Sequence, residues 1–171
     1  MNIDKIAVAA PGSYPPVQVT GQNRKYADMI LQDIAASKGE MTTIYQYLYQ
    51  CWCLESIDPD LASLLKRIAA VEAQHLDMLG RLVVLLGANP ICLSRPGNRN
   101  SAWNGNMINY HHGEKFILSY NIRLEQSSIH SYGAQIRSIK DPYISELLTR
   151  ISADEELHRD LFTEYLEFLE Q

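Results

Sequence analysis

Residues 58–79 and 141–162 are two copies of one sequence pattern, aligned without gaps and identical at ten of 22 positions. Both copies begin with Asp-Pro, which is typical of a helix start, because aspartate caps the N-terminus and proline fits the first helical position. A duplication of this kind predicts two similar helical hairpins related by an approximate twofold axis. The shared residues that can carry chemistry are Glu72, His75, Glu155 and His158.

Helical periodicity and helix-end signals divide the chain into an arm and four helices. Residues 1–22 contain three prolines and are expected to form an irregular N-terminal arm. Residues 23–170 are expected to form one domain, with a long connection over residues 88–112, which are rich in Asn, Gly, Ser and Pro. The expected helices span residues 23–56, 58–87, 113–139 and 141–169. The sequence therefore predicts an all-α antiparallel four-helix bundle, with one long crossover between its second and third helices.

Acidic residues interrupt the apolar face of each predicted helix, where a leucine would be expected. Glu72 and Glu155 stand in the apolar stripes of the second and fourth helices, and Glu40 and Glu125 in those of the first and third. At about 1.5 Å of rise per residue, each carboxylate lies roughly 20–27 Å from the turn of its own hairpin. The four glutamates and two histidines are therefore expected at one level inside the bundle.

Buried carboxylates are costly unless they are paired or bound to metal, and four together would also repel one another. Two divalent cations remove both costs, because four glutamates and two neutral histidines balance their charge. Glutamates from two helices plus Glu-x-x-His from the other two are the pattern of di-iron and di-manganese bundles. The sequence therefore predicts a centre of two metal ions, iron or manganese. Its expected ligands are Glu40, Glu72, His75, Glu125, Glu155 and His158.

The glutamates of this centre are expected to play two different parts. Glu72 and Glu155 are the expected bridging ligands, because the helix of each also carries a histidine. Glu40 and Glu125 are then the expected terminal ligands. Bridging carboxylates would hold the two ions at a fixed spacing, which positions a small substrate across them.

Three further residues are expected to hold the ligands in place. Tyr47 and Tyr132 each follow a ligand glutamate by seven residues, two turns along the same helix face, and are expected to hydrogen-bond a ligand carboxylate. Asp154 is expected to accept the second N–H of His75 across the bundle. Its counterpart in the duplication is Val71, so the two metal positions are expected to differ. No catalytic residue is assigned beyond the metal ligands.

Composition argues against several other classes of protein. The net charge of −5, without a basic cluster, argues against nucleic acid as a partner. The apolar stretches are too short to span a bilayer, and the first residues make a poor signal peptide. Cys51, Cys53 and Cys92 lack the spacing of a disulfide framework or a paired CxxC site. We expect a cytoplasmic protein with no nucleic-acid or membrane partner.

Over residues 23–169 the ligand pattern resembles that of the ferritin-like superfamily, in particular the rubrerythrin-like proteins. It is also similar to the pattern of manganese catalases and bacterioferritins. The resemblance implies a four-helix fold, a binuclear iron or manganese centre, a homodimer, and redox chemistry with hydrogen peroxide or dioxygen. The residues that carry it are Glu40, Glu72-x-x-His75, Glu125 and Glu155-x-x-His158.

Two departures separate this sequence from rubrerythrins. Rubrerythrins carry a rubredoxin module with two cysteine pairs, which this sequence lacks, so a peroxidase reaction would need an external electron donor. They also carry an additional glutamate three residues after the third-helix ligand, where this chain has Ser128. Both departures leave a manganese catalase-like or a bacterioferritin-like site as an alternative to a rubrerythrin-like one.

The leading functional expectation is an oxidoreductase that reduces or dismutates hydrogen peroxide. Cleavage of the O–O bond needs two electrons, and two adjacent metal ions can each supply one. One alternative is a ferroxidase or iron-handling protein, which would oxidise ferrous iron with dioxygen. Another is a metal-binding structural protein without turnover.

Overall fold

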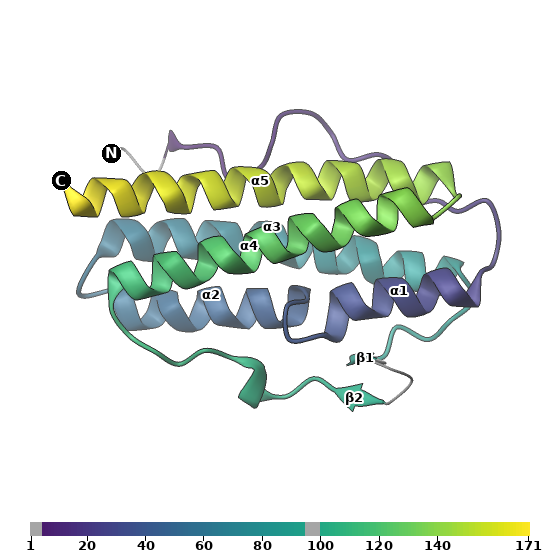
Figure 1. Cartoon of the computed structure of the whole chain (residues 1–171), viewed down its shortest axis with the longest axis horizontal. Coiled ribbons are helices and arrows are strands. Elements are labelled where there is room, and N and C mark those ends of the chain that lie inside the picture. The colour runs from purple at the N-terminus through teal and green to yellow at the C-terminus, as the bar shows by residue number, and fades with distance from the viewer. Residues whose placement is uncertain (1–4, 95–99) are drawn as a thin grey trace.

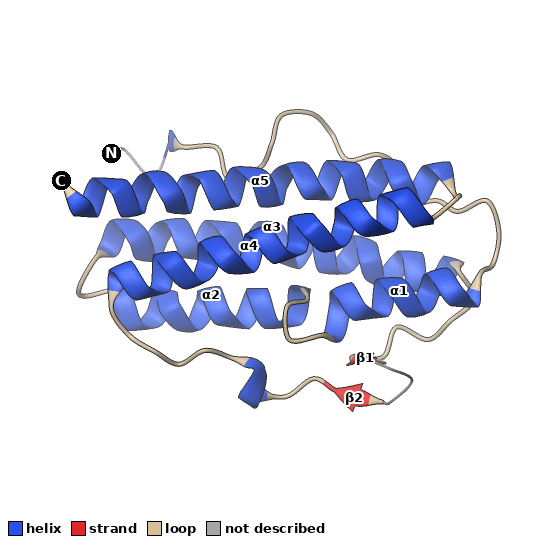
Figure 2. Ribbon diagram, viewed as in Figure 1, coloured by secondary structure: helices blue, strands red, loops and turns tan. Residues whose placement is uncertain are grey.

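The computed structural model describes residues 5–94 and 100–171 of the chain, and its main elements are α-helices (Figures 1 and 2). They are α1 (Arg24–Ala35), α2 (Glu40–Leu54), α3 (Pro59–Leu85), α4 (Glu114–Ser138) and α5 (Pro142–Glu170). None of the helices in this described part is long and apolar enough to cross a membrane.

The helices form a bundle of two antiparallel hairpins. In the first hairpin, α1 and α2 lie end to end and pack against α3. In the second, α4 packs along α5 (Figure 1). The segment between α3 and α4, described over residues 86–94 and 100–113, lies along the outside of α1 and α2 (Figure 1). It contains an antiparallel pair of two-residue strands, β1 (Leu93–Ser94) and β2 (Ser101–Ala102), and the 3-10 helix η3 (Gly105–Met107). The predicted four-helix bundle with one long crossover is confirmed.

The two Asp-Pro starts are built as the sequence predicts. Asp58 accepts a hydrogen bond from the Leu61 backbone N–H at the start of α3. Asp141 does the same for the backbone N–H groups of Tyr143 and Ile144 at the start of α5. These caps satisfy N–H groups that have no partner within the helix, so they fix where each hairpin turns and how deep its ligands lie.

The first predicted helix, residues 23–56, is not continuous. α1 ends at Ala35, Ala36 is extended (ψ 168°), and α2 starts after Gly39. The Thr42 hydroxyl donates a hydrogen bond to the Ala36 carbonyl and closes the break. A Cβ atom at Gly39 would lie 2.4 Å from the Asp33 carbonyl oxygen. The glycine therefore permits a close approach of the backbone. The break was not predicted because the apolar pattern on both sides of it is helical.

The core consists of two apolar clusters separated by a polar layer. One cluster includes Leu54, Leu65 and Phe162, and the other includes Ile30 and Leu148. The polar layer lies between them, because α3, α4 and α5 each pass from one cluster to the other at a glutamate, and α1 and α2 belong to different clusters on either side of Glu40. The buried residues of this layer are Glu40, Glu72, His75, Glu125, Glu155 and His158.

Candidate metal centre

The six predicted ligands meet in the middle of the bundle. They form two overlapping groups, and in each group one ligand atom from every member lies within 4.8 Å of the others. The side chains are almost completely buried, with Glu40 the most exposed at 4%. Glu72 and Glu155 belong to both groups, as expected of bridging ligands. The groups are Glu40, Glu72, His75 and Glu155, and Glu72, Glu125, Glu155 and His158.

Both histidines point Nδ1 toward the carboxylates and Nε2 away from them. His75 Nδ1 lies 2.8 Å from Glu72 and 3.2 Å from Glu155. His158 Nδ1 lies 2.9 Å from Glu72 and 3.9 Å from Glu125. Since Nε2 is engaged outside the cluster in each case, Nδ1 is the nitrogen available to a metal ion.

Several buried atoms of the cluster have no hydrogen-bond partner in the described part of the chain. Glu72 Oε1 and His158 Nδ1 are among them, although they lie only 2.9 Å apart. Buried polar atoms are almost always satisfied, and a cluster of unsatisfied acceptors is the arrangement that a cation would complete. The donor set fits divalent iron or manganese. The unsatisfied atoms are Glu72 Oε1, Glu125 Oε2, Glu155 Oε1 and His158 Nδ1.

Without metal ions, the cluster competes for protons. Burial and the negative charge of Glu72 raise the pKa of Glu40 well above its usual range. Burial and the same charge raise the pKa of Glu155 to about 8. Burial opposes ionisation of Glu72 too, but His158 and His75 outweigh it and hold its pKa at about 2. Without cations, Glu40 and Glu155 therefore bind protons, which reduce the negative charge of the cluster.

The two predicted tyrosines bind the terminal glutamates, and they do so crosswise between the hairpins. Tyr47 on α2 donates its hydroxyl to Glu125 on α4, and Tyr132 on α4 donates to Glu40 on α2. Each tyrosine thus contacts the glutamate of the opposite hairpin rather than the one on its own helix. These two hydrogen bonds connect the two hairpins at the level of the site.

Asp154 is placed as the sequence analysis expects. Its Oδ2 lies 2.9 Å from His75 Nε2. The corresponding partner of His158 is the backbone carbonyl of Val8, 2.8 Å from Nε2. Sequence reasoning missed Val8, together with Tyr14, whose hydroxyl donates to Asp154 at 2.6 Å. Both belong to the N-terminal arm, where no periodic pattern or motif signals contact with the site.

A small polar pocket lies at the break between α1 and α2, and none of the six ligands lines it. Its volume is about 130 Å³. Asp33 lies in it as a buried carboxylate, with Oδ1 accepting from the Gln135 amide at 2.7 Å and Oδ2 unpartnered among the described residues. Tyr132, at the wall of the pocket, is the residue that donates to Glu40. Ser128, where rubrerythrins carry a further glutamate, also lines this pocket.

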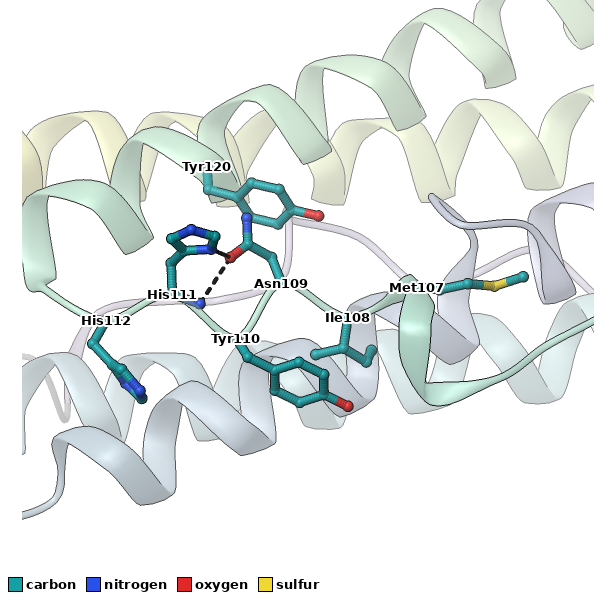
Figure 3. A pocket seen from close by; sticks show the side chains of 7 residues that line it. All are labelled: Met107, Ile108, Asn109, Tyr110, His111, His112 and Tyr120. Carbon is teal, nitrogen blue, oxygen red and sulfur yellow. Dashed lines mark hydrogen bonds between the residues drawn. The ribbon is translucent and has the colours of Figure 1, made fainter.

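A wider surface hollow of about 600 Å³ lies elsewhere, along the segment that precedes α4 (Figure 3). Its lining contains none of the six carboxylate-centre residues. His111 in this hollow lies 2.9 Å from the Asn109 side chain and stacks on Phe116 at 5.0 Å. His111 and His112 therefore contribute to this surface and not to the buried centre. The lining residues are Met107, Ile108, Asn109, Tyr110, His111, His112 and Tyr120.

Comparison with known proteins gives the same class of fold. Residues 34–116 match the Ferritin-like family model. Among solved structures, KatB, a manganese catalase from Anabaena, has a TM-score of 0.84 at 21% identity, over 97% of this chain and 82% of its own. A Desulfovibrio desulfuricans bacterioferritin has a TM-score of 0.73 at 20% identity, over 85% of this chain and 80% of its own.

A Mycobacterium tuberculosis bacterioferritin is similar as well, with a TM-score of 0.70 at 19% identity, over 87% of this chain and 89% of its own. No curated protein matches the chain in sequence. The fold and the buried carboxylate–histidine layer define a ferritin-like helical bundle. The chain is therefore similar in fold to ferritin-like proteins, and its side chains are grouped so that they could hold metal.

Proposed function

We propose that this protein is a binuclear metal oxidoreductase that disproportionates hydrogen peroxide in the manner of a catalase. The observation that carries the proposal is the pair of ligand groups that share Glu72 and Glu155. The likeness in fold to a manganese catalase over 97% of the chain supports it. A bound pair of iron or manganese ions would supply the two electrons that cleavage of the O–O bond requires.

The protein's own residues would hold and shield such a pair. Glu72 and Glu155 would be shared by the two ions, with His75 and Glu40 on one and His158 and Glu125 on the other. Because all six side chains are almost completely buried, bulk water and large reductants are excluded from the centre. Exclusion of water strengthens electrostatic interactions there and limits side reactions.

The polar pocket at the break between α1 and α2 would give a small substrate its approach. Its volume of about 130 Å³ accommodates only a few molecules of water size, since water occupies about 30 Å³ in the liquid. Hydroxyl and carboxyl groups of Ser128, Ser131 and Asp33 line it and can hydrogen-bond a peroxide. Tyr132 joins the pocket to Glu40 through its hydroxyl hydrogen bond.

Oxygen release distinguishes the catalase reaction from its rivals. Manganese-loaded protein is expected to release one dioxygen for every two peroxide molecules consumed, without added reductant. The variant Glu155→Gln should lose this activity, whereas Glu156→Gln, at the exposed neighbour on α5, should keep it. Consumption of peroxide only with an electron donor would replace the proposal with a rubrerythrin-like peroxidase.

The fold likeness to two bacterioferritins supports a second candidate, a ferroxidase that handles iron. That function predicts rapid oxidation of ferrous iron by dioxygen, and storage in addition predicts a large hollow assembly instead of a homodimer. Particle mass and iron oxidation rates therefore separate it from the catalase proposal. Tight metal binding without either reaction would indicate a structural metal-binding protein.

A further inference from the structure

The N-terminal arm, residues 5–22, runs over the α5 side of the bundle and reaches both histidines of the centre (Figure 1). Val8 offers its carbonyl to His158 Nε2 at 2.8 Å. Tyr14 places its hydroxyl 2.6 Å from Asp154 Oδ2 and 3.4 Å from His75 Nε2. The rings of Tyr14 and His75 also meet edge to face, with centroids 6.0 Å apart.

Asp154 is the point where the arm and the centre are joined. Its Oδ1 accepts the Ala10 backbone N–H at 2.6 Å, while Oδ2 accepts from Tyr14 and faces His75. These bonds hold the carboxylate in one orientation toward the imidazole. Burial raises the pKa of Asp154, but the hydrogen bonds with His75, Arg150, Tyr14 and Ala10 outweigh burial and lower this pKa. Asp154 therefore presents Oδ2 to the His75 ring as a hydrogen-bond acceptor.

Two arginines of the bundle hold the arm in place. Arg150 on α5 donates to the carbonyls of Ala10 at 2.7 Å and Gly12 at 3.3 Å, and its guanidinium lies 4.3 Å from the centre of the Tyr14 ring. Arg67 on α3 donates to the Ile6 carbonyl. At the far end, the Thr20 backbone N–H donates to Asp141 at 2.6 Å. The arm is thus attached on both sides of its contacts with the histidines.

We propose that the N-terminal arm is a working part of the metal centre, because it supplies or positions the outer hydrogen-bond partner of both ligand histidines. It presents a carbonyl to His158 and an oriented carboxylate to His75. Such partners fix which ring nitrogen faces the metal and increase its basicity, and a carboxylate does so more strongly than a carbonyl. The metal position at His75 should therefore be the tighter of the two, because Asp154 on α5 is its partner, and the arm orients this carboxylate. The inference rests on the proposed metal centre.

Titration with Co²⁺, followed by its visible absorption, tests the arm at the His75 position. Wild-type protein should bind two ions in two steps. Tyr14→Phe removes the hydroxyl and keeps the ring, and it should weaken the tighter step about tenfold while leaving the other unchanged. Tyr165→Phe is the matched control, because Tyr165 also donates its hydroxyl to an aspartate, Asp58, at 2.8 Å, but away from the centre. This control should leave both steps unchanged.

Hydrogen exchange of the backbone tests the whole arm. If the arm strengthens metal binding, metal binding must stabilise the arm by the same free energy. Amides of residues 5–14 should therefore exchange more slowly in Co²⁺-loaded wild-type protein than in metal-free protein, and Arg150→Met should reduce this protection. Equal exchange with and without metal, or a Tyr14→Phe titration identical to that of Tyr165→Phe, would overturn the inference. Failure of wild-type protein to bind two Co²⁺ ions would instead refute the metal centre itself.

Discussion

At the scale of single residues, burial separates the side chains that can serve the centre from those that cannot. Glu155 and Glu156 are neighbours on α5, yet Glu155 is 1% exposed within the polar layer and Glu156 faces solvent. Glu-x-x-His spacing alone does not make this distinction, because such a pair is common on solvated helices. The duplication makes it, since it places two such pairs at equal depth in the bundle.

Substitution of one shared carboxylate tests its part in metal binding. Glu155→Gln should reduce metal content from two ions per chain and weaken the remaining binding at least about tenfold, because Glu155 belongs to both ligand groups. Glu156→Gln should retain two ions. Equilibrium dialysis against Mn²⁺ measures both, with circular dichroism as a check of folding. Equal metal content in the two variants would contradict the assignment of Glu155.

Asp33 predicts a pH dependence of stability. Burial raises its pKa from 3.8 to about 7, against the opposing hydrogen bonds from Gln135 and Ser131. Between these values the folded state keeps a proton that the unfolded state has lost, so this group makes the protein less stable as pH rises from about 4 to 7. Asp33→Asn should therefore become progressively more stable than wild type over this range, by at most about 4 kcal/mol. Thermal unfolding at pH 5 and pH 8 checks this, and a difference that does not grow with pH would refute it.

At the scale of elements, a helix could be predicted from the sequence where a helical apolar pattern follows a capping residue such as the aspartate of Asp-Pro. The starts of α3 and α5 follow from Asp-Pro, and the ligand levels follow from helical rise. The break before Glu40 could not be predicted, because one glycine in a helical pattern is tolerated, and the close approach of Gly39 to the Asp33 carbonyl exists only in the folded backbone. The arm's contacts were also out of reach, since Val8 acts through a backbone carbonyl that every residue possesses.

Two glycine substitutions test the break as a built feature. Gly39→Ala should destabilise the protein by about 1–3 kcal/mol, because the new Cβ meets the Asp33 carbonyl at 2.4 Å. It should also weaken metal binding, since α2 begins at Glu40. Gly80→Ala, within α3 and without a close neighbour in the described structure, should stabilise by about 0.5–1 kcal/mol. Chemical denaturation measures both changes. A neutral Gly39→Ala would show that α1 and α2 tolerate a different junction.

At the scale of the whole molecule, the polar layer divides one bundle into two apolar halves. An empty layer of four glutamates is unfavourable, and the raised pKa values of Glu40, Glu125 and Glu155 express this cost. The folded metal-free protein therefore binds more protons than the unfolded chain at these positions, and its stability falls as pH rises toward about 8. Cations bound to the native state would remove that cost and add their own binding free energy.

Metal removal should thus lower the melting temperature, and more at pH 8 than at pH 6. Elemental analysis must first verify that the protein is stripped, and restoring Mn²⁺ should recover the original value. Calorimetry or circular dichroism measures the transition. An unchanged melting temperature after verified stripping would mean that the layer is stable without cations.

Anomalous diffraction from crystals grown with Mn²⁺ would locate metal ions in the polar layer directly. A centre of two metal ions should give two manganese peaks per chain inside the polar layer. One should lie beside His75 Nδ1 and Glu40, the other beside His158 Nδ1 and Glu125, with Glu72 and Glu155 between them. A map with a single peak in the layer, or with peaks only at surface carboxylates, would contradict the two-metal centre.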